Sequence, residues 1–396
     1  MTRYRSVRDV QVEGRRVFFR ADFNVPLEGG AIADDTRIGA ALPTLEHLLG
    51  RGASVVVCSH LGRPKGRVVE SLSLAPVAAR LSELLPGRAV RFVPDVAGEE
   101  ARAAARSLRA GEVLVLENVR FEPGETQGDE ALARSLRELA DLYVSEAFGA
   151  VHRPHASVCA LPRLFPERAV GFLLEREVEV LEGRLSAPAR PYVAFLGGAK
   201  VSDKIPILRG LLQRVDTLAV GGAMAYTFLK ACGYEVGTSR VEPELLETCR
   251  EILAEAEALG VRFLLPADHT AGPALDRPEE ARTVTGEALP PGLAGFDVGP
   301  KTSALYGALA ASAATIFWNG PMGVFEKPPF DRGTTALARA LADSGAVTVV
   351  GGGDSVLAVN RAGVAPRIGH ISTGGGASLE LAAGLPLPGL EALALS

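Results

Sequence analysis

The sequence predicts an α/β protein with two doubly wound parallel-sheet domains joined by a hinge helix. Two observations support this fold class. Short apolar runs alternate with longer segments of helical periodicity, and this alternation occurs twice along the 396 residues. A chain of this length has room for two or three domains. Its 47% hydrophobic and 22% charged residues are ordinary for a globular protein and exclude a disordered or fibrous chain.

The first series of expected strands comprises Val17–Arg20, Ser54–Ser59, Ala89–Val93, Val113–Leu116 and Leu142–Val144. Apolar residues at helical spacing predict helices over Leu72–Leu85 and Asp129–Ala140 between them. Ser71 is a suitable N-cap for the first of these helices, and Pro86-Gly87 would end it. Strands in such an alternation lie parallel, with helices on both faces of the sheet.

The second series of expected strands comprises Tyr192–Leu196, Thr217–Val220, Arg262–Leu265, Thr315–Trp318 and Val347–Val350. The helical patterns between and around them cover Val201–Gln213, Pro243–Leu259, Thr302–Ser312 and Thr334–Ala342. A charged, strongly helical stretch, Phe172–Leu185, separates the two series and ends at Ala187-Pro188. A polar helix of this kind is typical of a connection between two domains. Together these patterns predict two Rossmann-like domains.

Charge and cysteine content exclude several functional classes. The net charge is −5 and the isoelectric point is near 5.8, so the chain lacks the basic excess that binding to DNA or RNA requires. Its four cysteines are far apart in sequence, which favours a reducing compartment without disulfides or a cysteine-built metal site. The first ten residues have no apolar core typical of a signal peptide. We therefore expect a cytoplasmic protein.

In open α/β sheets, ligands bind at the carboxyl ends of the strands. In the first half of the chain, the expected strand ends are followed by arginine or histidine: Asp22 and Asn24 with Arg37, then His60 with Arg63, Arg120, and His152 with Arg153. Guanidinium groups match phosphate and carboxylate oxygens in a bidentate way. All but six of the 42 basic residues are arginine, so any one of them alone is typical of a surface ion pair. Their recurrence at strand ends predicts a site for a small, highly anionic molecule.

The second half contains neither G-x-x-x-x-G-K-[ST] nor G-x-G-x-x-G, so it supports neither a P-loop nor an ordinary dinucleotide site. Glycine clusters follow its strands instead, and each could be either a tight turn or a phosphate cradle. Lys200 and Lys204 would share one helical face at i, i+4, which is favourable if an anion lies between them. Asp354 follows three glycines, where a carboxylate fits if Mg²⁺ bridges it to phosphates.

These observations predict a small-molecule kinase with an anion site in one domain and a Mg²⁺–nucleotide site in the other. Closure of the two domains about the connecting helix would exclude water, which competes as phosphoryl acceptor. Two other interpretations remain. One is a kinase-like fold retained as a binding or regulatory protein, which would usually have lost Arg37, Lys200 or Asp354. The other is an acyl-phosphate kinase on a different two-domain α/β fold.

The order and length of the motifs decide between these interpretations. They are RADFNVP (Arg20–Pro26), DDTRI (Asp34–Ile38), SHLGRP (Ser59–Pro64), ENVRF (Glu117–Phe121), AFG with His152-Arg153, GGAKVSDKI (Gly197–Ile205), WNGPMGVFE (Trp318–Glu326), GGGDS (Gly351–Ser355) and STGGGASLE (Ser372–Glu380). Over essentially its whole length, the chain resembles the phosphoglycerate kinase family. The resemblance implies phosphoryl transfer from the acyl phosphate of 1,3-bisphosphoglycerate to ADP, giving 3-phosphoglycerate and ATP, by a monomeric glycolytic enzyme.

The resemblance also implies domain boundaries and site residues. The domains would be a phosphoglycerate-binding domain (1–171), a hinge (172–187), a nucleotide-binding domain (188–376) and a C-terminal segment that returns to the first domain (377–396). The implied phosphoglycerate site comprises Asp22, Phe23, Asn24, Arg37, His60, Leu61, Gly62, Arg63, Arg120 and Arg153. The implied nucleotide site comprises Lys204, Gly221, Gly222, Gly295, Asn319, Pro321, Glu326, Gly352, Gly353, Asp354 and Ser355, with Glu326 on the ribose hydroxyls and Asp354 on Mg²⁺. The groups implied to stabilise the transferred phosphoryl are Arg37, Lys200, Gly374 and Gly375.

Three residues depart from the family's pattern. Glu146 stands where an aspartate is usual before Ala-Phe-Gly, Ala223 replaces the third glycine after Gly222, and Pro154 follows Arg153. None of the three removes a charged residue of the implied sites. Because Ala223 lies near the expected adenine pocket, it could alter nucleotide preference.

Overall fold

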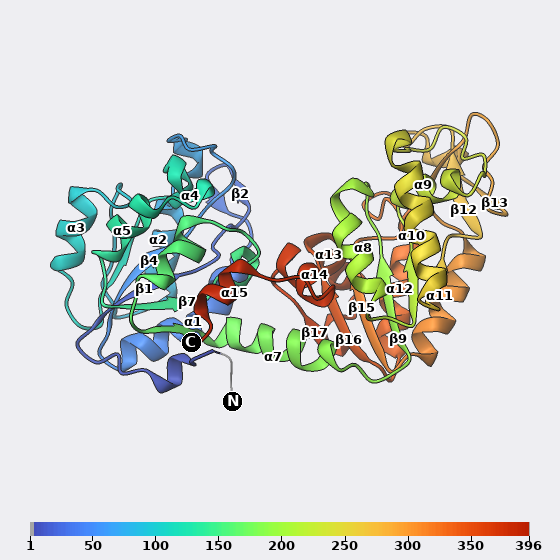
Figure 1. The fold of residues 1–396 in the computed structure, drawn as a ribbon. Coiled ribbons are helices and arrows are strands. Elements are labelled where there is room, and N and C mark those ends of the chain that lie inside the picture. Colours follow the sequence, from blue (N-terminus) through green and yellow to red (C-terminus); the bar gives the residue numbers. More distant parts are fainter. Residues whose placement is uncertain (1–3, 396) are drawn as a thin grey trace. The chain divides into compact units, whose positions relative to one another are not determined.

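The computed structural model describes residues 4–395 and divides the chain into two compact units. The first unit runs to Glu179 and also includes the segment from Pro386 onward, and the second unit is Val180–Leu385. Each unit is built around a six-stranded parallel sheet with helices packed against it (Figure 1). The predicted α/β class with two parallel-sheet domains is therefore confirmed.

In the first unit, the strand order is β5-β6-β4-β1-β7-β8, and every neighbouring pair is parallel. These strands are β1 (Arg16–Arg20), β4 (Ser54–Cys58), β5 (Val90–Phe92), β6 (Val113–Val115), β7 (Leu142–Ser145) and β8 (Arg168–Val170). The helices are α1 (Thr36–Gly50), α2 (Ala75–Leu84), α3 (Glu99–Arg106), α4 (Pro123–Gln127), α5 (Glu130–Arg137) and α6 (Leu161–Arg163). A short hairpin, β2 (Leu27–Glu28) and β3 (Ala31–Ile32), follows β1. The central strands are buried on both faces, as continuous runs such as Val55-Val56-Val57 predict.

The second unit has the strand order β11-β10-β9-β15-β16-β17, also parallel throughout. These strands are β9 (Tyr192–Leu196), β10 (Thr217–Val220), β11 (Arg262–Leu264), β15 (Thr315–Asn319), β16 (Val347–Gly351) and β17 (His370–Ile371). The helices are α8 (Ile205–Leu212), α9 (Met224–Ala231), α10 (Leu246–Ala258), α11 (Pro300–Ser312), α12 (Arg332–Asp343), α13 (Gly353–Arg361) and α14 (Gly376–Ala382). An additional antiparallel sheet of β12 (Asp268–Gly272), β13 (Arg282–Thr285) and β14 (Ala294–Val298) was not expected from the sequence pattern.

Helix α7 (Phe172–Ser186) covers the stretch expected to connect the domains, and the boundary between the units falls within it. Its first backbone N–H groups have side-chain acceptors. Phe172 donates to Thr44 Oγ1 (2.9 Å), while Leu173 and Leu174 donate to the two oxygens of Glu146 (3.1 and 3.0 Å). Glu146, one of the three departures, is thus the buried N-terminal cap of this helix. The expected hinge function of α7 stays a prediction.

The C-terminal helix α15 (Pro388–Leu393) packs on α6, β8 and the π-helical turn Ala156–Ala160 of the first unit. Gly389 donates to the carbonyl of Val151 (2.8 Å), and Arg168 donates to the carbonyl of Ala394 (3.0 Å). The contact boundary lies at Leu385/Pro386, so α14 remains within the second unit. Over residues 4–395, no helix is long and apolar enough to cross a membrane.

Candidate active site

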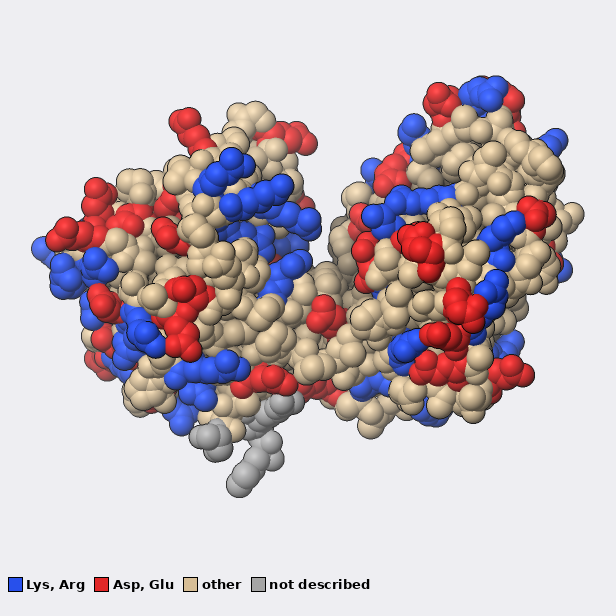
Figure 2. All heavy atoms as spheres, turned by 45° about the horizontal axis from the view of Figure 1, so that its top comes forward, with Lys and Arg blue, Asp and Glu red and all other residues tan. Residues whose placement is uncertain are grey.

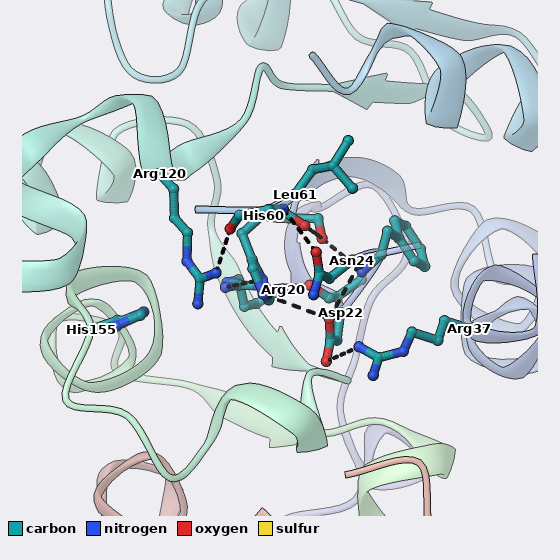
Figure 3. Close-up of polar contacts among 12 residues, drawn as sticks. Arg20, Asp22, Asn24, Arg37, His60, Leu61, Arg120 and His155 are labelled. Carbon is teal, nitrogen blue, oxygen red and sulfur yellow. Dashed lines mark hydrogen bonds and ion pairs between the residues drawn. The ribbon is translucent and has the colours of Figure 1, made fainter. Parts of the chain in front are cut away.

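The carboxyl edge of the first sheet collects the polar residues expected there. Strands β6, β4, β1 and β7 are consecutive neighbours and parallel, so the segments that follow them emerge at one edge. The residues on these segments are Arg120 after β6, His60 to Arg63 after β4, Asp22 and Asn24 after β1, and Arg153 after β7. Figure 3 shows Asp22, Asn24, Arg37, His60 and Arg120 converging on one region.

Hydrogen bonds connect the segments of this edge. Arg37, in the first turn of α1, donates to Asp22 Oδ2 (2.8 Å). Asn24 Oδ1 accepts from the backbone N–H of Gly62 (2.8 Å), and Arg120 donates to the carbonyl of Gly62 (2.7 Å). The loop at Gly62 is therefore held from two neighbouring strands, and the sequence-predicted residues form one connected group.

Two predicted residues contribute mainly through their backbones. The Phe23 and Leu61 side chains are buried in the hydrophobic core of the first unit. The Phe23 N–H donates to Ser59 Oγ (2.8 Å), which ties the segment after β1 to the end of β4. These residues shape the two loops while their side chains anchor them.

Asn118, which sequence reasoning did not assign to the site, holds these loops in place. It is fully buried, and its side chain makes four hydrogen bonds. Its Oδ1 accepts from the N–H groups of Leu61 (3.2 Å) and Arg120 (3.1 Å), and its Nδ2 donates to the carbonyls of Leu61 (2.7 Å) and Leu72 (2.9 Å). The ENVRF motif contains this residue, but a motif alone does not show that an amide, rather than a carboxylate, is required there.

A cavity of about 510 Å³ opens beside Arg120 and the loop at Gly62, and several cationic side chains line it. The cationic residues of its lining are Arg63, Lys65, Arg120 and Arg153, and His155 lies beside them. Figure 2 shows a dense group of basic side chains on this unit. Arg63 and Arg153, which the bonds above do not include, thus join Arg120 at this cavity. Lys65 was not predicted.

The site's positive charge comes from its arginines and Lys65, because its histidines are held neutral. Burial, followed by repulsion from Arg153, lowers the pKa of His152 to about 4. Burial, followed by repulsion from Arg120, lowers the pKa of His155 to about 3. Burial also lowers the pKa of Arg120 to about 10, with Arg20 and Arg153 as further causes. Crowded like charges of this kind favour a bound anion, which relieves the repulsion.

The carboxyl edge of the second sheet carries the predicted nucleotide residues. Lys204 Nζ donates to Asn319 Oδ1 (3.2 Å) at the end of β15, and Asn319 Nδ2 donates to the carbonyl of Gly351 (2.9 Å) at the end of β16. The N–H of Gly320 donates to Ser355 Oγ (2.6 Å). The ends of β15 and β16 are therefore joined through side chains of the predicted set.

Glycine is required here because the backbone segments pack closely. A Cβ on Gly222, whose φ is +69°, would lie 2.6 Å from the carbonyl oxygen of Gly198 and 3.1 Å from that of Pro321. A Cβ on Gly221 would meet the Met322 side chain. Ala223 has φ −64° at the N-cap position of α9, so this departure causes no backbone strain.

The expected shared helical face of Lys200 and Lys204 is wrong. Lys200 precedes the helical segment and is exposed, while Lys204 ends the 3-10 turn Ser202–Lys204 before α8. Pro206 lies in the first turn of α8, which explains why the regular helix begins only there. Lys204 is largely buried, and its pKa is lowered, first by burial, against opposing contributions from Asp203 and Asp354.

The remaining predicted residues lie at four places in the second unit. Gly295 is in β14, where its N–H donates to Ser239 Oγ (3.0 Å) and a Cβ would collide with the Tyr226 hydroxyl. Glu326 is exposed in the turns after β15. Gly352, with φ +95°, precedes α13, whose first residues are Gly353, Asp354 and Ser355. Gly374 and Gly375 directly precede α14.

The residues fit Mg²⁺ bound mainly through nucleotide phosphates. Among residues 4–395, no cluster of three or more His, Cys, Asp and Glu side chains could hold a metal ion. Asp354 offers a single exposed carboxylate at the N-terminus of α13. Mg²⁺ commonly uses one or two carboxylates together with substrate phosphates and water, so this donor set fits.

A sequence profile described as "Phosphoglycerate kinase" matches residues 7–385 of the chain. The chain belongs to the phosphoglycerate kinase family. It is 54% identical over 389 residues to the phosphoglycerate kinase of Thermomicrobium roseum, a match that covers 98% of this chain and 99% of that protein. It is 52% identical over 390 residues to that of Roseiflexus sp. (strain RS-1), with 98% of both chains covered.

Solved structures agree with this membership of the phosphoglycerate kinase family. The structure of phosphoglycerate kinase from Coxiella burnetii has a TM-score of 0.87 and 39% sequence identity to this chain. That from Pyrococcus horikoshii OT3 has a TM-score of 0.85 and 33% identity. Each match covers 98% of both chains, so the similarity extends over both units.

Proposed function

We propose that this chain catalyses reversible, Mg²⁺-dependent phosphoryl transfer from 1,3-bisphosphoglycerate to ADP, giving 3-phosphoglycerate and ATP. One observation carries the assignment: the two carboxyl sheet edges hold two different anion-binding chemistries. Arginines crowd the first edge, and glycine-rich backbone with Lys204 forms the second. Family membership supplies the reaction that uses both.

The first unit binds phosphoglycerate in this proposal. Arg63, Arg120 and Arg153 line the cavity beside the group, and their guanidinium forks suit a phosphate. Asp22 and Asn24 offer oxygen acceptors for the substrate hydroxyl, supported by the loop of Leu61 and Gly62. The pairing of Arg37 with Asp22 fixes the guanidinium near these acceptors.

The second unit binds the nucleotide. Lys204 and the N–H groups at Gly352–Ser355 face the phosphates, because helix N-termini and ammonium groups favour anions. Gly221, Gly222, Gly295, Asn319 and Pro321 form close-packed backbone around the base and phosphates. Glu326 holds the ribose hydroxyls.

Asp354 would hold Mg²⁺, which would neutralise part of the negative charge on the nucleotide phosphates. Phosphoryl transfer passes through a loose, strongly anionic state, so the protein acts mainly by positioning and electrostatic stabilisation. Arg37, Lys200 and the N–H groups at Gly374 and Gly375 stabilise the transferred group. No protein nucleophile is needed.

A coupled assay with 3-phosphoglycerate and Mg-ATP, which detects acyl-phosphate formation, tests the proposed reaction. Asp354→Ala should weaken binding of Mg-ADP in calorimetry, because it removes the one carboxylate proposed to hold the metal. Asp343→Ala is the matched control, since Asp343 lies in an exposed ion pair with Arg367. Equal affinities for Asp354→Ala and the parent protein would contradict the metal role.

We also propose that the protein acts as a monomer in the cytoplasm, as its resemblance to the family implies. Sedimentation of the purified protein across a concentration series tests the first statement. A mass that rises toward twice that of one chain would contradict it.

A further inference from the structure

A fully buried network of three polar side chains contacts His60, one of the residues at the first sheet edge. It comprises Arg20, the last residue of β1, Glu125 of α4 and Ser157 of the π-helical turn Ala156–Ala160. All three side chains are completely buried. Burying a guanidinium and a carboxylate costs free energy unless each is paired. This network therefore requires an explanation beyond packing.

The hydrogen bonds among these three side chains run from Arg20 through Ser157 to Glu125. Ser157 Oγ donates to Glu125 Oε1 (2.7 Å) and accepts from Arg20 Nε (2.8 Å), while the Ser157 N–H donates to Glu125 Oε2 (2.9 Å). A second Arg20 nitrogen, NH1, donates to the carbonyl of Ala21. The third nitrogen, NH2, lies 3.8 Å from Glu125 Oε1, within ion-pair distance but without a hydrogen bond to it. With these partners, the orientation of Arg20 is fixed.

Arg20 thereby presents its remaining nitrogen, NH2, to His60. The distance from NH2 to His60 Nδ1 is 3.3 Å, and Figure 3 shows the two side chains next to each other. A guanidinium has only N–H donors and no acceptor. Nδ1 must therefore accept, which leaves the ring proton on Nε2.

The Nε2 atom points to the substrate side. It lies 3.9 Å from Asp22 Oδ1, beyond hydrogen-bond distance, while the other Asp22 oxygen accepts from Arg37. We propose that Arg20 and Glu125 are positioning residues that fix His60 as a neutral tautomer, so that its Nε2–H is offered to an oxygen of the bound anionic substrate. The substrate part of this inference rests on the proposed function, whereas the tautomer does not.

The surroundings of His60 also disfavour its protonated form. Burial lowers the pKa of His60 well below its ordinary value, and the charges of Arg20, Arg120 and Arg37 act in the same direction. His155 adds no positive charge beside His60, because it is itself neutral, and the Asp22 carboxylate lies 3.9 Å from Nε2. His60 thus recognises the substrate as a directed N–H donor, and the arginines supply the positive charge.

Two-bond ¹H–¹⁵N correlation spectra of the uniformly labelled protein test the tautomer, with His60 assigned by its absence in His60→Gln. Between pH 6 and 8 we expect a protonated Nε2 and an unprotonated Nδ1. A protonated Nδ1, or an imidazolium at pH 6, would overturn the assignment.

Arg20→Lys tests the positioning role of Arg20, because lysine keeps the positive charge but cannot donate to Ser157, Ala21 and His60 from one planar group. We expect averaging of the His60 tautomers, a KM for 3-phosphoglycerate raised about tenfold, and a KM for ATP and a kcat within about threefold of the parent. Arg16→Lys is the matched control, since Arg16 pairs with Asp141 at the opposite end of the same strand. If Arg20→Lys does not fold, Ser157→Ala replaces it, because it removes only the hydroxyl that connects Arg20 to Glu125.

The outcomes separate the two ideas. An unchanged His60 tautomer in Arg20→Lys and Ser157→Ala would overturn the positioning role. A changed tautomer with an unchanged KM for 3-phosphoglycerate would overturn the donor role of Nε2. A parent protein without kinase activity but with the expected tautomer would contradict the proposed function and leave the assignment of His60 standing.

Discussion

Replacing the buried Asn118 with aspartate should separate the loops of the first site while leaving the shape of the side chain almost unchanged. The two bonds that Oδ1 accepts, from Leu61 and Arg120, survive in Asn118→Asp. The two bonds donated by Nδ2, to the carbonyls of Leu61 and Leu72, do not, and a carboxylate oxygen then faces both carbonyls. Each lost buried bond costs about 1–1.5 kcal/mol, and repulsion adds to this. We expect a total loss of about 3–5 kcal/mol in the free energy of unfolding.

Hydrogen exchange measured by mass spectrometry checks this expectation unit by unit. Peptides that contain Leu61 and Arg120 should lose protection in Asn118→Asp, while peptides from the second unit provide an internal reference. Steady-state assays should show a raised KM for 3-phosphoglycerate and a KM for ATP within about twofold of the parent protein, because the damage is confined to one site.

The control for this prediction is Asn360→Asp. Asn360 is exposed near the end of α13, so the same chemical change should cost less than about 0.5 kcal/mol there. If Asn118→Asp lost less than about 1 kcal/mol and kept its KM for 3-phosphoglycerate, the amide could not be what holds these loops together.

Three other substitutions test separate parts of the structure. Arg37→Ala should lower kcat about 100-fold or more and raise KM less, because its contact with the transferred group tightens in the transition state; steady-state kinetics showing the reverse would contradict that role. Burial raises the pKa of Asp297 to about 8 from an ordinary value of 3.8, so the folded state binds this proton more tightly and the free energy of unfolding should fall by roughly 3 kcal/mol from pH 5 to 8. Denaturation experiments across this pH range should show a smaller fall in the free energy of unfolding for Asp297→Asn. The same pH dependence in the variant and the parent would contradict a raised pKa for Asp297. Glu146→Asp should cost about 1–2 kcal/mol by the same measurement, because the shorter side chain cannot reach Thr44 and both N–H groups of α7; equal stability would show that the cap tolerates either length.

Periodicity was sufficient to predict ten of the twelve strands that form the two main sheets. Val55-Val56-Val57 and Phe317-Trp318 are buried on both faces, and such continuous apolar runs indicate parallel strands. The edge strands β8, of three residues, and β17, of two residues, were missed. Helix α1 was missed because Gly39 and Pro43 interrupt its pattern, although its apolar face packs into the core.

The antiparallel sheet β12–β14 could not be predicted from alternation. Its residues, such as Asp268 and Thr270 in β12, are polar, and several of them act on neighbouring elements. Asp268 accepts from the N–H groups of Lys301 and Thr302 at the start of α11, so this strand residue serves as a helix cap. A pattern of hydrophobic residues does not detect this kind of tertiary hydrogen bonding.

Candidate site residues could be named from the sequence where the residue type itself indicates the chemistry. Arginines after strands and glycine clusters before helices both indicate anion binding. The structure brings Asp22, Asn24, Arg37, His60 and Arg120 together. Residues that act through others gave no such signal. Arg20 follows the buried apolar run Val17-Phe18-Phe19, and this charge at a buried position was a signal in the sequence. Its partner Glu125, however, lies 105 residues away, and only the fold brings the two together.

The two proposed anion sites differ in how their binding groups are held in place. In the first unit, long arginine side chains need fixed partners, and Asp22, the Gly62 carbonyl and Glu125 supply them. In the second unit, backbone N–H groups at helix starts are already rigid, so glycine at Gly222 and Gly352 serves to bring segments close rather than to hold side chains. Substitutions should therefore act differently at the two edges. Loss of a supporting side chain, such as Asn118 or Arg20, loosens the first site gradually, whereas any added Cβ at Gly222 disrupts the second outright.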